Sequence, residues 1–422
     1  MNLIKNNYGE LIYESTLDNG MNVYIVHKPE FVSSYAMIAT PFGAFDLEQV
    51  DASGVHYHFQ PGSAHFLEHK LFEDENRDVL SMFADMGASA NAGTSYESTS
   101  YYFSHSGSIE KPLSLLLDFV QSLSISDASV EKEKGIIIQE LSMYDQMPDF
   151  RLYMETLKSI YHNHPLKYDI GGSAQSVRDT TREELECAYS LNYHPANMIL
   201  VVVTQEDPAA VLSFIEQNQL SKTFPADPKI KRVLQDEPAT VVRKDYTFTM
   251  RAETEKYFIG YKLPAYTGDD LERLRIESML FFILESNFST LNPQYQDWLD
   301  QGIISDYFSY EINYGKDQAM LLFANEGNNS DALAQLIESI LAHPVVDEDK
   351  LEQLKRRYMG STIRMFTNYD RYAQQLIQSR FKGTQLFELI EGIHSIRIEE
   401  LEEAKKEFVL TNRTITKVKI SN

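Results

Sequence analysis

The stretch "DASVEKEKGIIIQE" (residues 127–140) resembles a later stretch, "DEDKLEQLKRRYMG" (347–360), at an offset of 347 − 127 = 220. A second pair, "SVRDTTREELECAY" (176–189) and "SIRIEELEEAKKEF" (395–408), has an offset of 395 − 176 = 219. Similar stretches that recur at nearly one offset indicate an internal duplication. We therefore predict two homologous α+β halves, each a sandwich in which a sheet carries its helices on one side.

Chain length and local composition suggest where the two halves meet. A chain of 422 residues is too long for one ordinary core and suits two domains of roughly 200 residues each. The segment 221–239 is charged, contains three prolines and has no clear period, which is typical of a linker. We predict an N-terminal domain over 1–220, this linker, and a homologous C-terminal domain over 240–422 that carries no metal site.

Both halves contain recognisable strands. In the first half, "SSYAMIATPFGAF" (33–45) is predicted to be a strand, and "EKYFIGYKLPAY" (255–266) resembles it in the second half. Residues 63–87 show helical spacing, and a β-rich run follows at 90–106. The apolar stretch "NMILVVVT" (197–204) is predicted to be the last strand of the first half.

The composition limits the classes of function. Hydrophobic residues make up 43% of the chain and charged residues 24%, which is typical of a folded globular protein. Lys+Arg of 38 against Asp+Glu of 62 gives a net charge of −24, which argues against a nucleic-acid partner. Cys187 is the single cysteine, and no stretch has the apolar length of a signal peptide or a membrane helix. We expect a soluble cytoplasmic protein with no membrane partner.

The stretch "SAHFLEHKLFE" (63–73) contains a candidate metal site. In a helix, His65 and His69 lie one above the other on one face, and Glu68 lies about one turn from His65. Two imidazoles at this spacing can reach one zinc ion, and a nearby carboxylate can take a proton from a bound water. The order H-x-x-E-H is the inverzincin arrangement. Catalytic zinc usually has three protein ligands, so a third must come from elsewhere in the chain.

The best candidate for the third ligand lies in the duplicated stretch 127–140. Glu140 follows His69 at an offset of 140 − 69 = 71, and Glu133 precedes Glu140 by two helical turns, on the same face. At the offset of 220 that relates the two halves, the counterpart of Glu140 is Gly360, which offers no ligand. Any metal site of this kind therefore belongs to the first half.

Several stretches beyond "HFLEH" resemble one known family, the pitrilysin family of zinc metallopeptidases. They follow one another in the family's order: "LDNGMNVYIV" (17–26), "GASANAGTSYESTSYYF" (87–103), "VEKEKGIIIQEL" (130–141) and "YHPANMILVVV" (193–203). The processing peptidase of mitochondria belongs to the same family. In detail the chain looks most like the YmfH-like branch found in Gram-positive bacteria.

The resemblance implies a complete zinc centre with one ion per chain. His65, His69 and Glu140 would bind Zn²⁺, and Glu68 would be the general base. Glu133 would be a carboxylate that orients a ligand from outside the coordination sphere. The implied activity is that of a zinc metalloendopeptidase, a hydrolase that cleaves extended or unfolded peptides.

The resemblance also has implications for the substrate and for a partner. Asn91 and Ala92 would lie on an edge strand to which a peptide adds as an extra strand. Related peptidases carry an Arg and a Tyr, seven residues apart, in the second half, and here those positions are Gln296 and Ile303. We therefore expect a homodimer or a heterodimer with another pitrilysin-like subunit. The alternative is a non-catalytic subunit that binds peptides or assembles with a partner on the same scaffold.

Overall fold

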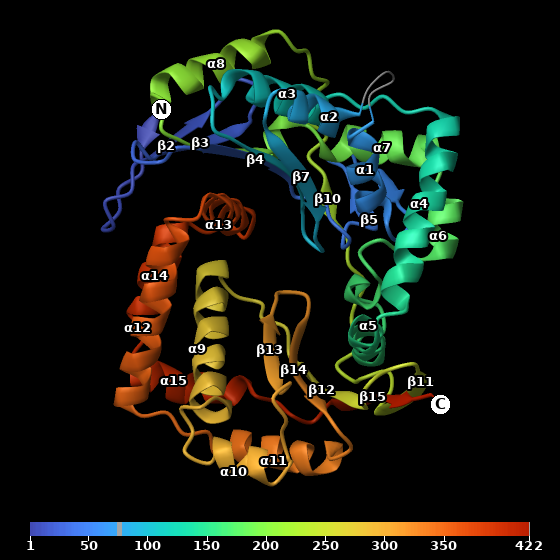
Figure 1. Cartoon of the computed structure of the whole chain (residues 1–422), viewed down its shortest axis with the longest axis vertical. Helices are drawn as coiled ribbons and strands as arrows, with labels where there is room; N and C mark the ends of the chain where they lie inside the picture. The colour runs from blue at the N-terminus through green and yellow to red at the C-terminus, as the bar shows by residue number, and fades with distance from the viewer. Residues whose placement is uncertain (74–77, 422) are drawn as a thin grey trace. The chain divides into compact units, whose positions relative to one another are not determined.

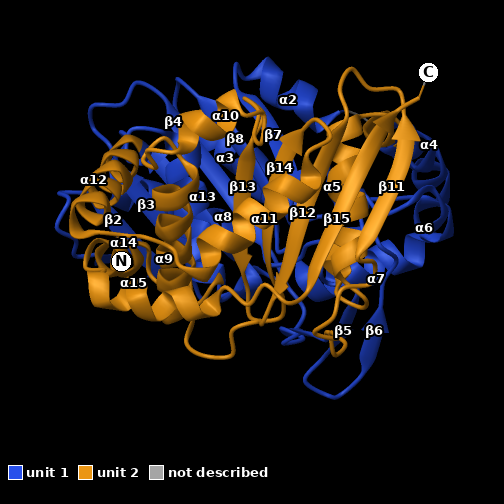
Figure 2. Cartoon of the chain, turned by 90° about the horizontal axis from the view of Figure 1, so that it is seen from below, with its two compact units in different colours: residues 1–141, 168–233, 365–381 blue, residues 142–167, 234–364, 382–422 orange. Residues whose placement is uncertain are grey.

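The computed structural model describes residues 1–73 and 78–421, which form two compact units. Unit 1 comprises 1–141, 168–233 and 365–381, and unit 2 comprises the remaining described residues (Figure 2). Both units are discontinuous in sequence. The predicted domain limits at residues 220 and 239 stay a prediction.

Unit 1 is built on a seven-stranded sheet with the order β1-β2-β3-β9-β4-β8-β7. Its strands are β1 (Asn2–Leu3), β2 (Ile12–Thr16), β3 (Asn22–His27), β4 (Ser34–Thr40), β7 (Ser89–Thr94), β8 (Thr99–His105) and β9 (Ile199–Thr204). Among these strands only β3 and β9 pair in parallel. Every residue of β4 and β9 is buried, because both faces of the sheet are covered there, and this explains why their sequences are mostly apolar.

Helices of the first half cover one face of this sheet (Figure 1). The helices of unit 1 are α1 (Ser63–Leu71), α2 (Val79–Asp85), α3 (Glu110–Val120), α4 (Asp127–Asp145), α6 (Ala174–Asp179), α7 (Arg182–Asn192), α8 (Pro208–Leu220) and α13 (Tyr369–Phe381). The last turn of α4 continues into unit 2. The predicted helical stretch 63–87 contains α1 and α2, and its residues 74–77 lie outside those described.

A small three-stranded sheet of unit 1 includes part of the segment predicted as a linker. Its order is β10 (Lys231–Arg232), β5 (Glu48–Val50) and β6 (His56–His58). The guanidinium of Arg232 donates two hydrogen bonds of 2.8 Å to the buried carboxylate of Asp46. This bidentate pair fastens β10 beside β5.

Unit 2 is built on a five-stranded sheet with the order β11-β15-β12-β14-β13. Its strands are β11 (Asp245–Met250), β12 (Lys256–Leu263), β13 (Ser309–Tyr314), β14 (Ala319–Glu326) and β15 (Arg413–Ile420). Its helices are α5 (Pro148–Ile160), α9 (Asp270–Phe288), α10 (Tyr295–Asp300), α11 (Ser330–Ala342), α12 (Glu348–Met365), α14 (Leu386–His394) and α15 (Ile398–Ala404). Most of its core lies between the sheet and α9, α11, α12 and α15.

The order of the strands confirms the predicted pair of homologous halves. In unit 1 the order β3-β9-β4-β8-β7 has the same succession and directions as β11-β15-β12-β14-β13 in unit 2. The offset found in the sequence also holds, because the starts of β7 and β13 differ by 309 − 89 = 220 in number. Of the five strands that the two sheets share, the first and last along the chain, β3 with β9 and β11 with β15, pair in parallel.

Each sheet receives one helix from the other half of the chain. Helix α13 packs on β4 and β9 of unit 1, where the Tyr35 hydroxyl donates to Asp370 at 2.9 Å. Helix α5 packs on β12 and β15 of unit 2, where Leu152 is buried with Phe258 and Val418. The starts of the two helices differ by 369 − 148 = 221 in number, so they are equivalent elements of the duplication.

Candidate metal centre

Helix α1 presents one apolar face and one polar face. Phe66, Leu67 and Leu71 are buried in the core of unit 1, whereas His65 and His69 are only partly covered. The helix begins after Gly62, whose φ of 101° suits glycine. A Cβ atom at Gly62 would come within 2.4 Å of the carbonyl oxygen of Gly171, so a larger residue cannot fit where α1 starts.

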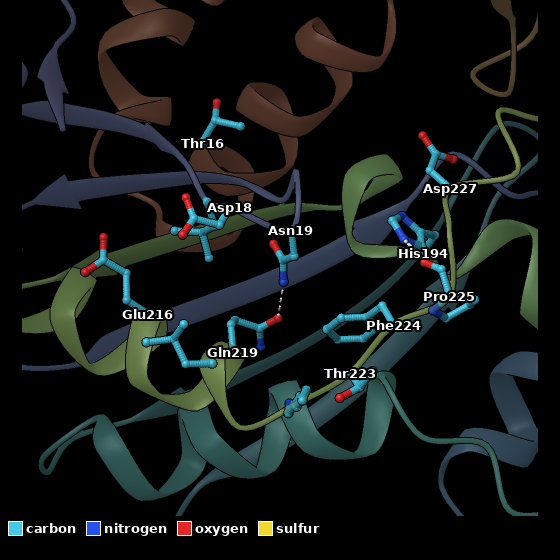
Figure 3. Close-up of a pocket in the computed structure, with 13 residues that line it drawn as sticks. Thr16, Asp18, Asn19, His194, Glu216, Gln219, Thr223, Phe224, Pro225 and Asp227 are labelled. Atoms are coloured by element: carbon cyan, nitrogen blue, oxygen red, sulfur yellow. Dashed lines mark hydrogen bonds between the residues drawn. The ribbon is translucent and has the colours of Figure 1, made fainter.

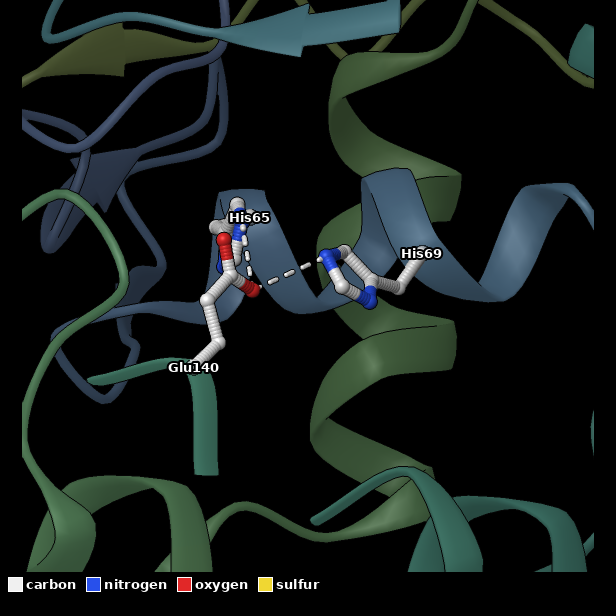
Figure 4. Close-up of side chains that lie close together, drawn as sticks. All are labelled: His65, His69 and Glu140. Atoms are coloured by element: carbon white, nitrogen blue, oxygen red, sulfur yellow. Dashed lines mark ion pairs between the residues drawn. The ribbon is translucent and has the colours of Figure 1, made fainter. Parts of the chain in front are cut away.

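His65, His69 and Glu140 come together as the sequence predicted (Figure 4). One ligand atom from each lies within 4.8 Å of the other two. His65 Nε2 is 3.8 Å from Glu140 Oε2, and His69 Nε2 is 3.6 Å from the same oxygen. Ligands at about 2.0–2.2 Å from a tetrahedral zinc ion lie about 3.3–3.6 Å from one another. The 3.6 Å separation falls in this range and the 3.8 Å separation is slightly longer, so the two imidazole nitrogens and the carboxylate oxygen could hold one zinc ion after a small adjustment.

Glu133 supports His69 from the side away from this cluster. Its Oε1 lies 2.9 Å from Nδ1 of His69, and its side chain is buried. Glu133 and Glu140 both belong to α4, two turns apart. The hydrogen bond to Nδ1 directs Nε2 of His69 toward Glu140, which is the arrangement that metal-binding histidines usually have.

The electrostatic environment differs between the two histidines. Burial lowers the pKa of His65 to about 4, and repulsion from His69 acts in the same direction. Burial also acts to lower the pKa of His69, but its hydrogen bond to Glu133 and the charges of Glu133 and Glu68 outweigh burial and raise it. The hydrogen bond from His69 in turn lowers the pKa of Glu133. His65 is therefore neutral at physiological pH, the form in which imidazole binds a metal.

Glu68 lies beside the cluster and contacts the edge strand β7. The Thr94 hydroxyl, at the end of β7, donates to Glu68 Oε2 at 2.6 Å. Burial raises the pKa of Glu68, although the Thr94 hydrogen bond opposes this shift. A partly desolvated carboxylate with one fixed oxygen is suited to proton transfer.

Asn91 and Ala92 lie on β7, which is the last strand of its sheet. The Ala92 N–H is not part of the ladder with β8, since it donates to its neighbour's Asn91 Oδ1 at 2.8 Å. The strand therefore presents a backbone donor along its open edge, as strand addition requires. β7 and Glu68 are joined through Thr94, so the edge begins next to the cluster.

The two positions predicted to lack an Arg–Tyr pair lie in unit 2. Gln296 is exposed on α10 and donates to Asp300 at 2.8 Å, and Ile303 packs against the core of unit 2. Tyr307, a nearby tyrosine, donates to Asp149 at 2.7 Å.

One concavity of unit 1 does not involve these residues. It has a volume of about 760 Å³ and lies between the end of β2, α8 and the segment 222–227 (Figure 3). Asn19 donates to Gln219 at 2.8 Å, and His194 Nε2 donates to the Pro225 carbonyl at 3.0 Å. Asn19 and His194 thus have partners within the lining, and we assign no function to this concavity.

Two residues near the cluster were not identified from the sequence. Thr94 lies within the stretch that resembles the family, but nothing in its spacing indicates a bond to Glu68. Lys70 lies on the apolar face of α1 with Phe66 and Leu67 and is fully buried. A lysine at a position with apolar periodicity is a signal that could have identified it.

Comparison with known proteins agrees with this geometry. Residues 57–174 match the family described as insulinase, peptidase family M16, and residues 179–360 match the peptidase M16 inactive domain. An uncharacterized zinc protease of Bacillus subtilis, YmfH, is 33% identical over 415 residues, which are 97% of this chain and 96% of that protein. The chain belongs to peptidase family M16.

Solved structures of M16 relatives share the fold. A protein of Alicyclobacillus acidocaldarius described as M16-like is 31% identical, with a TM-score of 0.92 over 99% of this chain and all of that chain. Pitrilysin is 15% identical, with a TM-score of 0.76 over 99% of this chain and 46% of its own, and this likeness concerns the fold alone. The predicted pitrilysin resemblance and fold are thereby confirmed. In the part of the chain that the structure describes, no helix is long and apolar enough to cross a membrane.

Proposed function

We propose that this M16 protein is a zinc-dependent endopeptidase that cleaves extended peptides. His65, His69 and Glu140 would hold one zinc ion per chain, and Glu68 would be the general base. The observation that carries the proposal is the convergence of three ligand atoms within 4.8 Å, with Glu68 on the same helix as both histidines. Glu133 adds support, because it holds His69 by its other nitrogen.

The residues around the cluster would have separate roles in hydrolysis. Zinc, when bound, lowers the pKa of a water molecule and polarises the carbonyl of the substrate. Thr94 holds Oε2 of Glu68 at 2.6 Å, which leaves Oε1 to take the proton from the attacking water. Glu68 then gives this proton to the leaving amine nitrogen, so the carboxylate returns to its starting form.

The substrate would bind as an additional strand on β7. The Ala92 N–H donates to the side chain of its neighbour Asn91, which an incoming peptide carbonyl would replace. A folded protein presents no backbone edge for this pairing, so unfolded segments and short peptides are the proposed substrates. The cytoplasm is the proposed location, because Cys187 as a single cysteine suits a reducing compartment.

Full activity would require a second M16 subunit, identical or related. The proposal rests on Gln296 and Ile303, which stand where related peptidases carry the Arg and Tyr that stabilise the oxyanion. Loss of one such donor costs a factor of roughly 10² to 10³ in kcat. Peptide turnover should therefore rise when a subunit with the Arg–Tyr pair is added. Equal turnover with and without it would refute the need for a partner.

Glu68→Gln provides the decisive test of catalysis. The variant should keep its zinc, measured by metal analysis of the purified protein, because Glu68 is not a ligand. Its turnover of a peptide library should fall by roughly 10² to 10⁴. Glu97→Gln, on the exposed turn after β7, is the matched control and should change neither quantity. If the wild type binds zinc but hydrolyses nothing alone or with a partner, the non-catalytic peptide-binding role is the correct one.

A further inference from the structure

Lys70 is a buried cation next to a proposed zinc ligand. It follows His69 on α1, and its side chain has no exposed surface. Phe66, Leu67 and Leu71 surround the same face of the helix. Lysine is almost never fully buried unless it is paired, so the position calls for a specific explanation.

The ammonium group of Lys70 connects the two helices that form the cluster. It makes an ion pair with Glu73, which follows the end of α1, and donates to the backbone carbonyl of Ser129 at 3.2 Å. Ser129 lies in the first turn of α4, one turn before Glu133. Lys70 is thus the next residue after His69 on α1. The carbonyl that it contacts on α4 lies one turn before Glu133, the hydrogen-bond partner of His69.

Stability alone does not explain this arrangement. Removing the Lys70 ammonium from water costs free energy that its attraction to Glu73, whose side chain is 30% exposed, only partly returns. A buried ion pair can often be replaced by apolar residues with no loss of stability, and an apolar side chain would match the rest of this face of α1. The cost of burying this ammonium points to a role in positioning the two helices that it connects.

We propose that Lys70 is a positioning residue for the metal centre, and this inference rests on the function proposed above. Lys70 holds the first turns of α4 against α1, so that Glu133 stays in register with Nδ1 of His69. The 2.9 Å contact between those atoms tolerates little displacement. A shift of α4 would also move Glu140, since both carboxylates belong to that helix. The zinc ligands are thereby held in place before the ion binds.

Zinc affinity of the purified full chain tests this role. Metal-free protein is titrated with zinc against a chelator of known affinity, for the wild type and for Lys70→Met. We expect the variant to bind zinc about 10–100-fold more weakly, the loss typical of disturbing the surroundings of a metal ligand. Circular dichroism of the metal-free proteins confirms that both are folded.

Lys28→Met is the matched control. Lys28 also belongs to unit 1, is 8% exposed and pairs with a carboxylate, Glu10, at 2.8 Å. Its removal disturbs a covered ion pair of the same kind in a part of the sheet that holds no zinc ligand. We expect the zinc affinity of this variant to equal that of the wild type. An equal loss in Lys28→Met and Lys70→Met would mean a general effect on folding and would overturn the proposal.

A double variant separates positioning from independent effects. If Lys70 acts through Glu133, then Lys70→Met should weaken zinc binding much less in a Glu133→Gln background than in the wild type. Fully additive losses, or an unchanged affinity in Lys70→Met, would overturn the proposal. If Lys70→Met does not fold, Glu73→Gln keeps the lysine and weakens its anchor, and the same comparisons apply. A wild type that binds no zinc would refute the metal centre itself, which is a distinct result.

Discussion

Helices α4 and α12 occupy equivalent places in the two units but differ in what they carry. Glu133 and Glu140 on α4 correspond, at the offset of 220, to Gln353 and Gly360 on α12. Both helices nevertheless bury apolar residues, among them Val130 and Ile137 of α4 and Leu351 and Leu354 of α12. Glu133 is itself buried among the apolar residues of α4, so a helix at this place in the fold can hold the two carboxylates or lack them while its apolar residues keep it packed.

His65→Ala should produce the largest effect, because it removes one of the three proposed zinc ligands that distinguish unit 1 from its counterpart. We expect the metal-free variant to keep the thermal stability of the metal-free wild type, since His65 is not part of the apolar core. Its zinc affinity should fall by more than the roughly 10–100-fold expected at Glu133. Metal analysis after dialysis checks the loss. Zinc retained at one ion per chain would show that the ligands lie elsewhere.

Ala92→Pro tests the second feature proposed for unit 1 alone, the substrate edge. Proline removes the N–H that faces away from β8, so the β7–β8 ladder is preserved while a peptide loses one donor. One lost hydrogen bond of about 0.5–1.5 kcal/mol corresponds to a rise in KM of about 2–13-fold, with zinc content unchanged. Asn91→Ala is the paired variant, which uncovers the same N–H and should not raise KM. An unchanged KM in Ala92→Pro would remove β7 from the binding site.

Lowering the pH should remove the stabilising contribution of Glu237, a carboxylate of unit 2 that has only a structural role. Burial alone would raise the pKa of Glu237, but the Lys262 ammonium and the N–H groups of residues 162–164 outweigh burial and lower it. Its stabilising contribution is therefore complete above the unfolded pKa of about 4.3 and is lost as pH falls through the lower folded value.

The corresponding variant is Glu237→Gln. At pH 7 it should have a lower Tm than the wild type, and the difference should shrink as the pH is lowered below about 4. Thermal unfolding followed by circular dichroism between pH 7 and pH 3 measures both. A difference in Tm that is the same at every pH would mean that the charge of Glu237 contributes nothing.

Gly360→Ala should give the smallest change in stability among these variants. It tests whether α12 needs its glycine, in comparison with the glycine of α4. A Cβ atom at Gly360 meets no other atom within 4 Å, and the same holds for Gly135 on α4. Alanine in place of a mid-helix glycine should stabilise the protein by about 0.5–1 kcal/mol at either position. Urea unfolding measures the gain. A destabilised Gly360→Ala would indicate that α12 needs the glycine for a close contact.

The parts of the site that follow from local spacing could be predicted from the sequence. His65 and His69 are four apart on one helix, and Glu133 and Glu140 are seven apart on another, so helical periodicity alone places each pair on one face. Thr94 and Lys70 could not be assigned in this way. Their partners are Glu68 and Ser129, 26 and 59 residues away, and such pairings depend on how the elements pack.

The duplication was visible for a similar reason, since an apolar period and a constant offset survive in the sequence. The sequence did not show that α5 packs on the sheet of unit 2 and α13 on the sheet of unit 1. Both helices are amphipathic, and a pattern of this kind shows that a face is buried but not which sheet buries it.

This packing of α5 and α13 has a consequence for making the two halves of the chain as separate fragments. A fragment ending in the segment 221–239 would contain the sheet of unit 1 but not α13, and it would leave Tyr35 and Met37 uncovered. The complementary fragment would lack α5 and expose Phe258. Each half made separately would therefore present an apolar sheet face and aggregate, whereas the two halves made together in one cell could complete each other. Each half of the chain therefore depends on a helix of the other half to cover one face of its sheet.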